Sequence, residues 1–186
     1  MKKNICVFGG SVSGKNIENQ KTAKIIGKII AENNFNIVFG GGENGIMGAV
    51  AQSGIENGAK TTGIIPNFLL KKDILDSAHS KIFNSKLIKT KTMHQRKKMM
   101  YDSSHGFLVL PGGIGTLDEC FEVLTWCQLN QIKNKNVGII NFKGYWDPLI
   151  NLINHIIKEE FMGMNNLNYF EEIKNLHMLN IFLKNI

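Results

Sequence analysis

The sequence has few cysteines and no long apolar run. Its three cysteines, Cys6, Cys120 and Cys127, show no C-x-x-C spacing, which disfavours a disulfide framework and a structural zinc site. No stretch approaches the roughly 20 apolar residues that a transmembrane helix needs. The N-terminus leads into the short apolar run Ile5–Phe8 and not into a signal-peptide core. We therefore expect a cytoplasmic protein without a membrane partner.

Acidic residues are also scarce relative to basic ones, since 22 Lys and Arg stand against 15 Asp and Glu, for a formal net charge of +7. Such a balance raises the question of nucleic-acid binding. Most of the lysines are scattered among Asn and Ile, however, and the one dense cluster, Lys86–Lys98, contains residues suited to a phosphorylated small molecule. We expect no nucleic-acid partner.

The chain has the length of one domain, with apolar runs that alternate with segments of helical period. This alternation is typical of a parallel sheet covered by helices, and it predicts one α/β domain over residues 1–186. The predicted strands are Ile5–Phe8, Asn36–Phe39, Thr61–Ile65, Lys86–Ile88, Gly106–Leu110 and Val137–Asn141. The predicted helices cover about 17–33, 45–54, 92–103, 116–129 and 146–159.

Two segments lack a clear pattern. The periodicity fails over Asn67–Ser85, which we interpret as a loop or irregular short helix that covers a binding site. The tail, Met162–Ile186, is compatible with helix but gives no firm assignment.

Glycine-rich turns follow three of the predicted strands: GGSVSG (9–14), GGGENGIMG (40–48) and PGGIGT (111–116). Any one of them could serve only to let the chain turn. Together they would lie at the carboxyl edge of a parallel sheet, where backbone N–H groups and helix N-termini bind anions, phosphate above all. The first turn departs from the dinucleotide fingerprint at Ser11, and no Walker motif occurs. A mononucleotide is therefore the expected ligand.

Two further segments contain residues suited to catalysis. Glu119, in PGGIGTLDE, would lie about 5 Å below the phosphate-binding helix end, within reach of a ribose. However, Thr116–Glu119 also spells a capping box, in which Glu119 would only bond the helix N-terminus. In MHQRKKMM, residues 93–100, Arg96 and Lys97 share a helix side with Met93 and Met100. The alternative here is an amphipathic helix with solvated basic residues.

The motifs GGGENGIMG, MHQRKKMM and PGGIGTLDE, in this order and spacing, resemble the LONELY GUY family. These proteins are cytokinin riboside 5'-monophosphate phosphoribohydrolases, long labelled possible lysine decarboxylases. The resemblance extends from ICVFGGS to GYWDPLI. It implies a Rossmann-like, doubly wound parallel sheet and a homodimer without metal or organic cofactor. The implied activity is hydrolysis of the N-glycosidic bond of N6-substituted adenosine 5'-monophosphates or of AMP, releasing base and ribose 5-phosphate.

The resemblance also implies roles for individual residues. Arg96 and Glu119 match the catalytic pair, whereas Lys97 and the run Gly113–Glu119 match nucleotide-binding positions. Asp73 stands where relatives carry a glutamate that reaches the nucleotide, and its shorter side chain leaves the base selectivity open. The segment before MHQRK is also longer than in many relatives. Together with the glycine-turn argument, the expected substrate-binding residues are Ser11, Asp73, Lys97, Gly112, Gly113, Ile114, Gly115, Thr116 and Thr125.

The chemistry agrees with these assignments. Cleavage of a ribosyl C–N bond develops positive charge on the sugar, which a carboxylate such as Glu119 would stabilise. The planar fork of Arg96 suits a phosphate or the departing purine. The sequence does not choose between cytokinin nucleotides and AMP, and it does not identify the group that protonates the base.

Three rival functions remain at the level of sequence. A carrier of the same fold, similar to molybdenum cofactor carriers, would keep the glycine turns without a catalytic pair. A nicotinamide oxidoreductase is disfavoured by Ser11, and a decarboxylase would need a lysine in Schiff-base linkage to pyridoxal phosphate.

Overall fold

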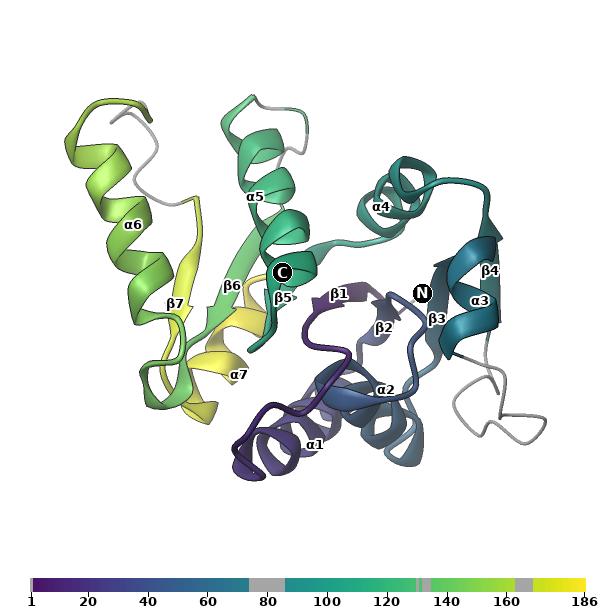
Figure 1. Ribbon diagram of the computed structural model, residues 1–186. Helices are drawn as coiled ribbons and strands as arrows, with labels where there is room; N and C mark the ends of the chain where they lie inside the picture. Colours follow the sequence, from purple (N-terminus) through teal and green to yellow (C-terminus); the bar gives the residue numbers. More distant parts are fainter. Residues whose placement is uncertain (1, 74–85, 130, 132–134, 163–168) are drawn as a thin grey trace.

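The computed structural model describes residues 2–73, 86–129, 131, 135–162 and 169–186. These residues form a seven-stranded, wholly parallel sheet with helices on both faces (Figure 1). The predicted α/β class is confirmed. None of the helices within these residues is long and apolar enough to cross a membrane.

The strands are β1 (Asn4–Phe8), β2 (Asn36–Phe39), β3 (Thr61–Pro66), β4 (Lys86–Thr90), β5 (Gly106–Val109), β6 (Asn136–Ile140) and β7 (Glu171–Ile173). Their order in the sheet is β4-β3-β2-β1-β5-β6-β7. The chain therefore builds outward from β1 in one direction and then returns to place β5 on its other side. The carboxyl ends of β1 and β5 form a topological switch point, where open α/β sheets bind their ligands.

Between the strands run α1 (Glu18–Glu32), α2 (Gly45–Glu56), α3 (Asn67–Asp73), α4 (Met93–Asp102), α5 (Ile114–Gln128), the 3₁₀ turn η1 (Phe142–Gly144), α6 (Asp147–Lys158) and α7 (Leu176–Lys184). Helices α1, α2 and α7 cover one face of the sheet, and α4, α5 and α6 cover the other (Figure 1). This is the doubly wound arrangement.

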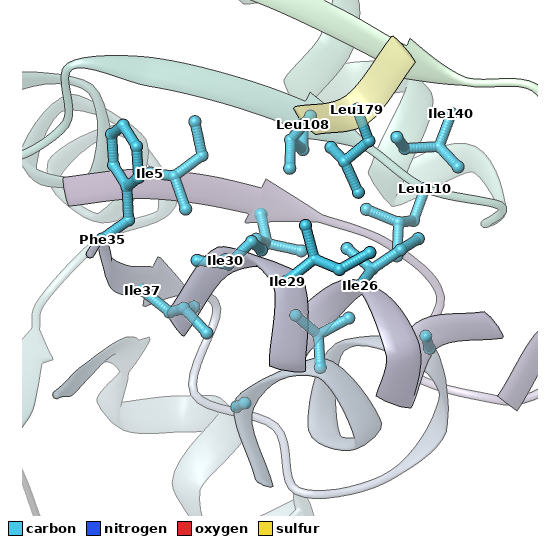
Figure 2. Packing of buried hydrophobic residues seen from close by; sticks show 14 of the residues in the cluster. Ile5, Ile26, Ile29, Ile30, Phe35, Ile37, Leu108, Leu110, Ile140 and Leu179 are labelled. Atoms are coloured by element: carbon cyan, nitrogen blue, oxygen red, sulfur yellow. The ribbon is translucent and has the colours of Figure 1, made fainter. Parts of the chain in front are cut away.

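Successive strand residues serve opposite faces of the sheet, as the period of a strand requires. In β1, Ile5 and Val7 enter the core under α1, whereas Cys6 and Phe8 enter the core under α5. Figure 2 shows the first of these cores, with side chains of α1 such as Ile26 and Ile30 directed at the sheet. Because both of their faces are buried, the central strands β1, β2 and β5 read as short apolar runs, which made them predictable.

The structure differs from the expectation at two places. The tail contains β7 and α7, and the strand was missed because its sequence, Glu-Glu-Ile, is short and has no apolar run. The predicted irregular segment begins as the regular helix α3. The remainder of that segment, 74–85, lies outside the described residues.

Candidate active site

The three glycine turns meet at the carboxyl edge of the sheet, as the sequence predicts. They are joined by backbone hydrogen bonds: the Gly10 N–H donates to the Pro111 carbonyl over 3.0 Å, and the Ile46 N–H donates to the Gly10 carbonyl over 2.9 Å. Close contact between the turns requires glycine. Gly45 has a φ of 68°, and a Cβ on it would overlap the backbone of Ser11. The turns therefore form one continuous loop layer.

A cleft with a volume of ≈ 520 Å³ opens between this loop layer and helices α3, α4 and α5. That is within the usual size range of small-molecule sites. Of the residues predicted to bind substrate or catalyse, those that line the cleft are Ser11, Arg96, Gly113, Ile114, Gly115, Thr116 and Glu119. The sequence motifs are therefore parts of one concave site.

Helix α5 directs its N-terminus at the cleft. The helix begins at Ile114 with Gly113 as its N-cap, and no side chain caps it. The capping-box interpretation is therefore wrong, because Thr116 lies inside the first turn and Glu119 is too far along the helix to bond the cap. The N–H of Thr116 donates to the Gly113 carbonyl, and its buried side chain packs against Gly112, where an added Cβ would overlap the Thr116 hydroxyl. The free helix end carries partial positive charge and suits an anion.

Arg96 reaches the cleft from α4, whose start is fixed by the Thr92 hydroxyl accepting the Gln95 N–H. Its Nε donates to the Ile64 carbonyl over 3.1 Å, and its Nη2 donates to the Gly40 carbonyl at 3.5 Å. These carbonyls lie in β3 and just after β2. They hold the guanidinium between two strand ends, where a Cβ on Gly40 would overlap it.

Glu119 faces Arg96 from α5. Its Oε1 lies 3.5 Å from Nη2 of Arg96, and the two side chains are 6% and 10% exposed, respectively. Burial raises the pKa of Glu119 to about 7, against the opposing effect of the Arg96 charge. A carboxyl that titrates near neutrality, opposite a fixed cation in a cleft, is a frequent feature of catalytic sites.

Lys97 is buried but does not line the cleft. Its Nζ lies 2.5 Å from Oε2 of Glu122 and 3.0 Å from Oδ2 of Asp118. Burial opposes its charge, but the hydrogen bonds to Glu122 and Asp118 outweigh this and raise the pKa of Lys97. The interpretation of α4 as a helix with solvated basic residues is wrong for Arg96 and Lys97.

Two other predicted residues, Thr125 and Gly112, do not line the cleft, and the structure does not describe the side chain of a third, Asp73. Thr125 is exposed on α5, and its hydroxyl donates to the Phe121 carbonyl over 2.7 Å. Gly112 lines a neighbouring pocket with Gly10 and Gly113, and its carbonyl accepts the Tyr145 hydroxyl over 2.7 Å. Asp73 ends α3, and its side chain is not among the described parts of the chain.

The cleft also contains residues to which the sequence argument gave no individual role. Met47, Leu69 and Met93 give it an apolar wall, and Asp118 adds a second carboxylate beside Glu119. The place of Asp118 next to Glu119 in TLDE was the available signal. Leu69 lies in the segment that was expected to cover a binding site, but no periodicity singled it out, because α3 reaches the cleft through tertiary packing. Among the described residues, no group of three His, Cys, Asp or Glu side chains could hold a metal ion.

Comparisons with known proteins agree with this geometry. Residues 47–180 match the family described as "Possible lysine decarboxylase". A cytokinin riboside 5'-monophosphate phosphoribohydrolase of Arabidopsis thaliana is 38% identical over 161 residues, which cover 87% of this chain and 72% of that protein. A bifunctional cytokinin biosynthesis protein of Fusarium pseudograminearum is 37% identical over 175 residues. The match covers 86% of this chain but only 35% of that protein.

Solved structures show the same fold at lower identity. The molybdenum cofactor carrier protein of Chlamydomonas reinhardtii superposes with a TM-score of 0.68 at 20% identity, covering 99% of this chain and 97% of that one. The molybdenum cofactor binding protein of Rippkaea orientalis gives the same TM-score and identity. At this identity the likeness concerns the fold alone.

Proposed function

This chain belongs to the LONELY GUY family of cytokinin riboside 5'-monophosphate phosphoribohydrolases, and we propose that it hydrolyses the N-glycosidic bond of a nucleoside 5'-monophosphate. Water adds to C1' of the ribose while the C–N bond breaks, and the products are the free base and ribose 5-phosphate. The substrates are N6-substituted adenosine 5'-monophosphates or AMP.

The observation that carries this proposal is the Arg96–Glu119 pair. The leaving base draws electrons from the sugar, so that C1' and the ring oxygen acquire positive charge in the transition state. The Glu119 carboxylate, desolvated and fixed, stabilises that charge more strongly than a solvated group would. Arg96, held by two main-chain carbonyls, presents its remaining N–H groups to the substrate.

The two ends of the cleft fit the two ends of a nucleotide. The uncapped N-terminus of α5, with Gly113–Thr116, receives the 5'-phosphate. The apolar wall of Met47, Leu69 and Met93 accepts the flat face of the purine. Binding energy from both ends orients the ribose against Glu119, and this orientation raises the rate of the chemical step.

A homodimer is part of the proposal. The exposed side of α5 carries Ile114 and Phe121 and ends at the C-cap Leu129; these residues are 82%, 36% and 60% exposed, respectively. Their spacing places them along one stripe of the helix, and a second copy of this chain would cover that stripe. Thr125 lies on the same stripe, so in such a dimer it would face the partner.

The test is turnover by the purified full chain. AMP and N6-isopentenyl-AMP are incubated with the protein, adenosine serves as the control without phosphate, and free base and ribose 5-phosphate are measured. We expect base from at least one nucleotide and much less from adenosine, because the phosphate anchor is missing. Binding of both nucleotides without release of base would overturn the proposal and favour a carrier of this fold.

A further inference from the structure

Asp118 is a carboxylate at the cleft wall that is held from behind. Its side chain is 53% exposed and lines the cleft together with Glu119. Both of its oxygens lie within hydrogen-bond distance of Lys97 Nζ, Oδ1 at 3.2 Å and Oδ2 at 3.0 Å. Each carboxylate oxygen keeps a further acceptor position, so Asp118 can accept hydrogen bonds from a ligand while it remains bound to Lys97.

Lys97 is fixed independently of Asp118. Its side chain is only 9% exposed and also bonds Glu122, which in turn accepts the hydroxyl of the buried Tyr101 over 3.1 Å. The ammonium group is thus immobilised between two helices. This arrangement differs from an ordinary surface pair such as Lys98–Asp102, whose side chains are 68% and 60% exposed and which contributes little energy.

Building on the proposed function, we propose that Asp118 binds the ribose hydroxyls of the substrate and that Lys97 is the positioning residue that orients it. The 2'- and 3'-hydroxyls of a ribose are two neighbouring donors, which match the two oxygens of one carboxylate. The two carboxylates thereby divide their roles, since Glu119 acts at the reacting bond and Asp118 holds the sugar.

The position of Asp118 on α5 favours the ribose over the other parts of a nucleotide. A carboxylate repels a phosphate, and Asp118 lies about 7.5 Å along the axis from the N-cap Gly113 that receives the anion. The purine wall is apolar and comes from other elements. The sugar between them is the part with hydroxyl donors, and it must lie beside Glu119, the neighbour of Asp118.

This arrangement selects ribonucleotides over 2'-deoxyribonucleotides. With a 2'-deoxynucleotide, Asp118 loses one of its two hydroxyl donors, and the oxygen that would have accepted it keeps only Lys97 as a partner. A hydrogen bond to a charged group contributes enough for about tenfold discrimination or more. Because the two substrates also differ in intrinsic reactivity, the informative quantity is the ratio of kcat/KM for AMP to that for 2'-deoxy-AMP, compared between variants and wild type.

The experiment measures this ratio for wild type, Asp118→Ala, the isosteric Asp118→Asn and Lys97→Met. We expect the ratio to fall about tenfold or more in both Asp118 variants and by a smaller factor in Lys97→Met, in which Asp118 is present but unoriented. The matched controls are Asp102→Asn and Lys98→Met. They break the exposed Lys98–Asp102 pair on α4, the helix that also carries Lys97, and should leave the ratio unchanged.

The outcomes separate this inference from the proposed function. If wild type releases base but the ratio does not change in either Asp118 variant, Asp118 does not bind the ribose. If the ratio changes in the Asp118 variants but not in Lys97→Met, the positioning role of Lys97 is refuted. Loss of folding alone would lower both kcat/KM values without changing their ratio, and absence of turnover in wild type would refute the proposed function instead.

Discussion

The guanidinium of Arg96 lies 3.5 Å from the carboxylate of Glu119, and both side chains are almost completely buried although they face a cleft. Burial of an opposite-charge pair costs desolvation energy that attraction returns only in part. Apolar packing would join two helices without this desolvation cost. The pair is therefore better explained by its action on a ligand than by stability.

Gly40 makes room for this pair, so Gly40→Ala should impair it. The added methyl group would overlap the Arg96 guanidinium and displace it from Glu119. We expect kcat for base release to fall by at least about tenfold, on the scale of one misplaced electrostatic group. Steady-state kinetics, with circular dichroism to verify folding, provide the measurement.

A double-mutant cycle tests the steric reason. In the Arg96→Ala background the guanidinium is absent, so Gly40→Ala should cost no further activity and little stability. Equal and additive losses of stability in both backgrounds would show that Gly40 is needed for another reason.

The pH dependence of catalysis should report Glu119. Its pKa is raised to about 7, with burial as the main cause, and the proposed mechanism needs the ionised form. We therefore expect kcat/KM to fall as the pH decreases below about 7, instead of near the ordinary carboxyl value of 4.5. A rate that falls above pH 7 would mean that the protonated acid is the active form.

A variant distinguishes Glu119 from the substrate phosphate, which also titrates near pH 6. Because the charge of Asp118 helps to raise the pKa of Glu119, Asp118→Asn should move the acidic limb to lower pH. The phosphate pKa would not move with this substitution, so an unchanged limb would assign it to the substrate.

Stability should depend on pH through the same group. Since the folded protein raises the pKa of Glu119 above 4.5, it favours the neutral acid. This contribution is complete below pH 4.5 and is lost as the pH rises through about 7. Between pH 4.5 and 8 the free energy of unfolding should therefore fall more in wild type than in Glu119→Gln, by up to about 3 kcal/mol. The free energies of unfolding are measured by urea titration at each pH. The same pH dependence in wild type and in Glu119→Gln would contradict this prediction.

The sequence predicted the sheet well for a physical reason. Strands buried on both faces, such as Asn36–Phe39, are short apolar runs bounded by turns, and glycine turns at their ends mark the ligand edge. The three-residue strand Glu171–Ile173 has no such signal, because its place is set by pairing with β6.

The site was less predictable because its side chains are placed by tertiary packing. Local spacing favoured a capping role for Glu119 and solvent exposure for Lys97. Only the packing of α4 against α5 shows that Glu119 faces Arg96 and that Lys97 bonds Asp118 and not the cleft. The contribution of Leu69 comes from a helix that no periodicity predicted.

The apolar stripe on α5 predicts the state of association. Phe121→Asp places a charge in the proposed contact between copies, so it should shift the protein from dimer to monomer in analytical ultracentrifugation. Ile25→Asp is the matched control, because Ile25 is 44% exposed but lies on α1, on the opposite face of the sheet (Figure 1). A wild-type monomer, or equal effects of both substitutions, would contradict the proposed dimer.

The most direct measurement of the central claim compares base release and nucleotide binding in wild type and Glu119→Ala. Loss of the carboxylate should lower kcat for N6-isopentenyl-AMP or AMP by at least about 100-fold, whereas calorimetry should still detect binding, since the phosphate site at α5 remains. Base release at the wild-type rate by Glu119→Ala would contradict the assignment of the Arg96–Glu119 pair as the catalytic centre.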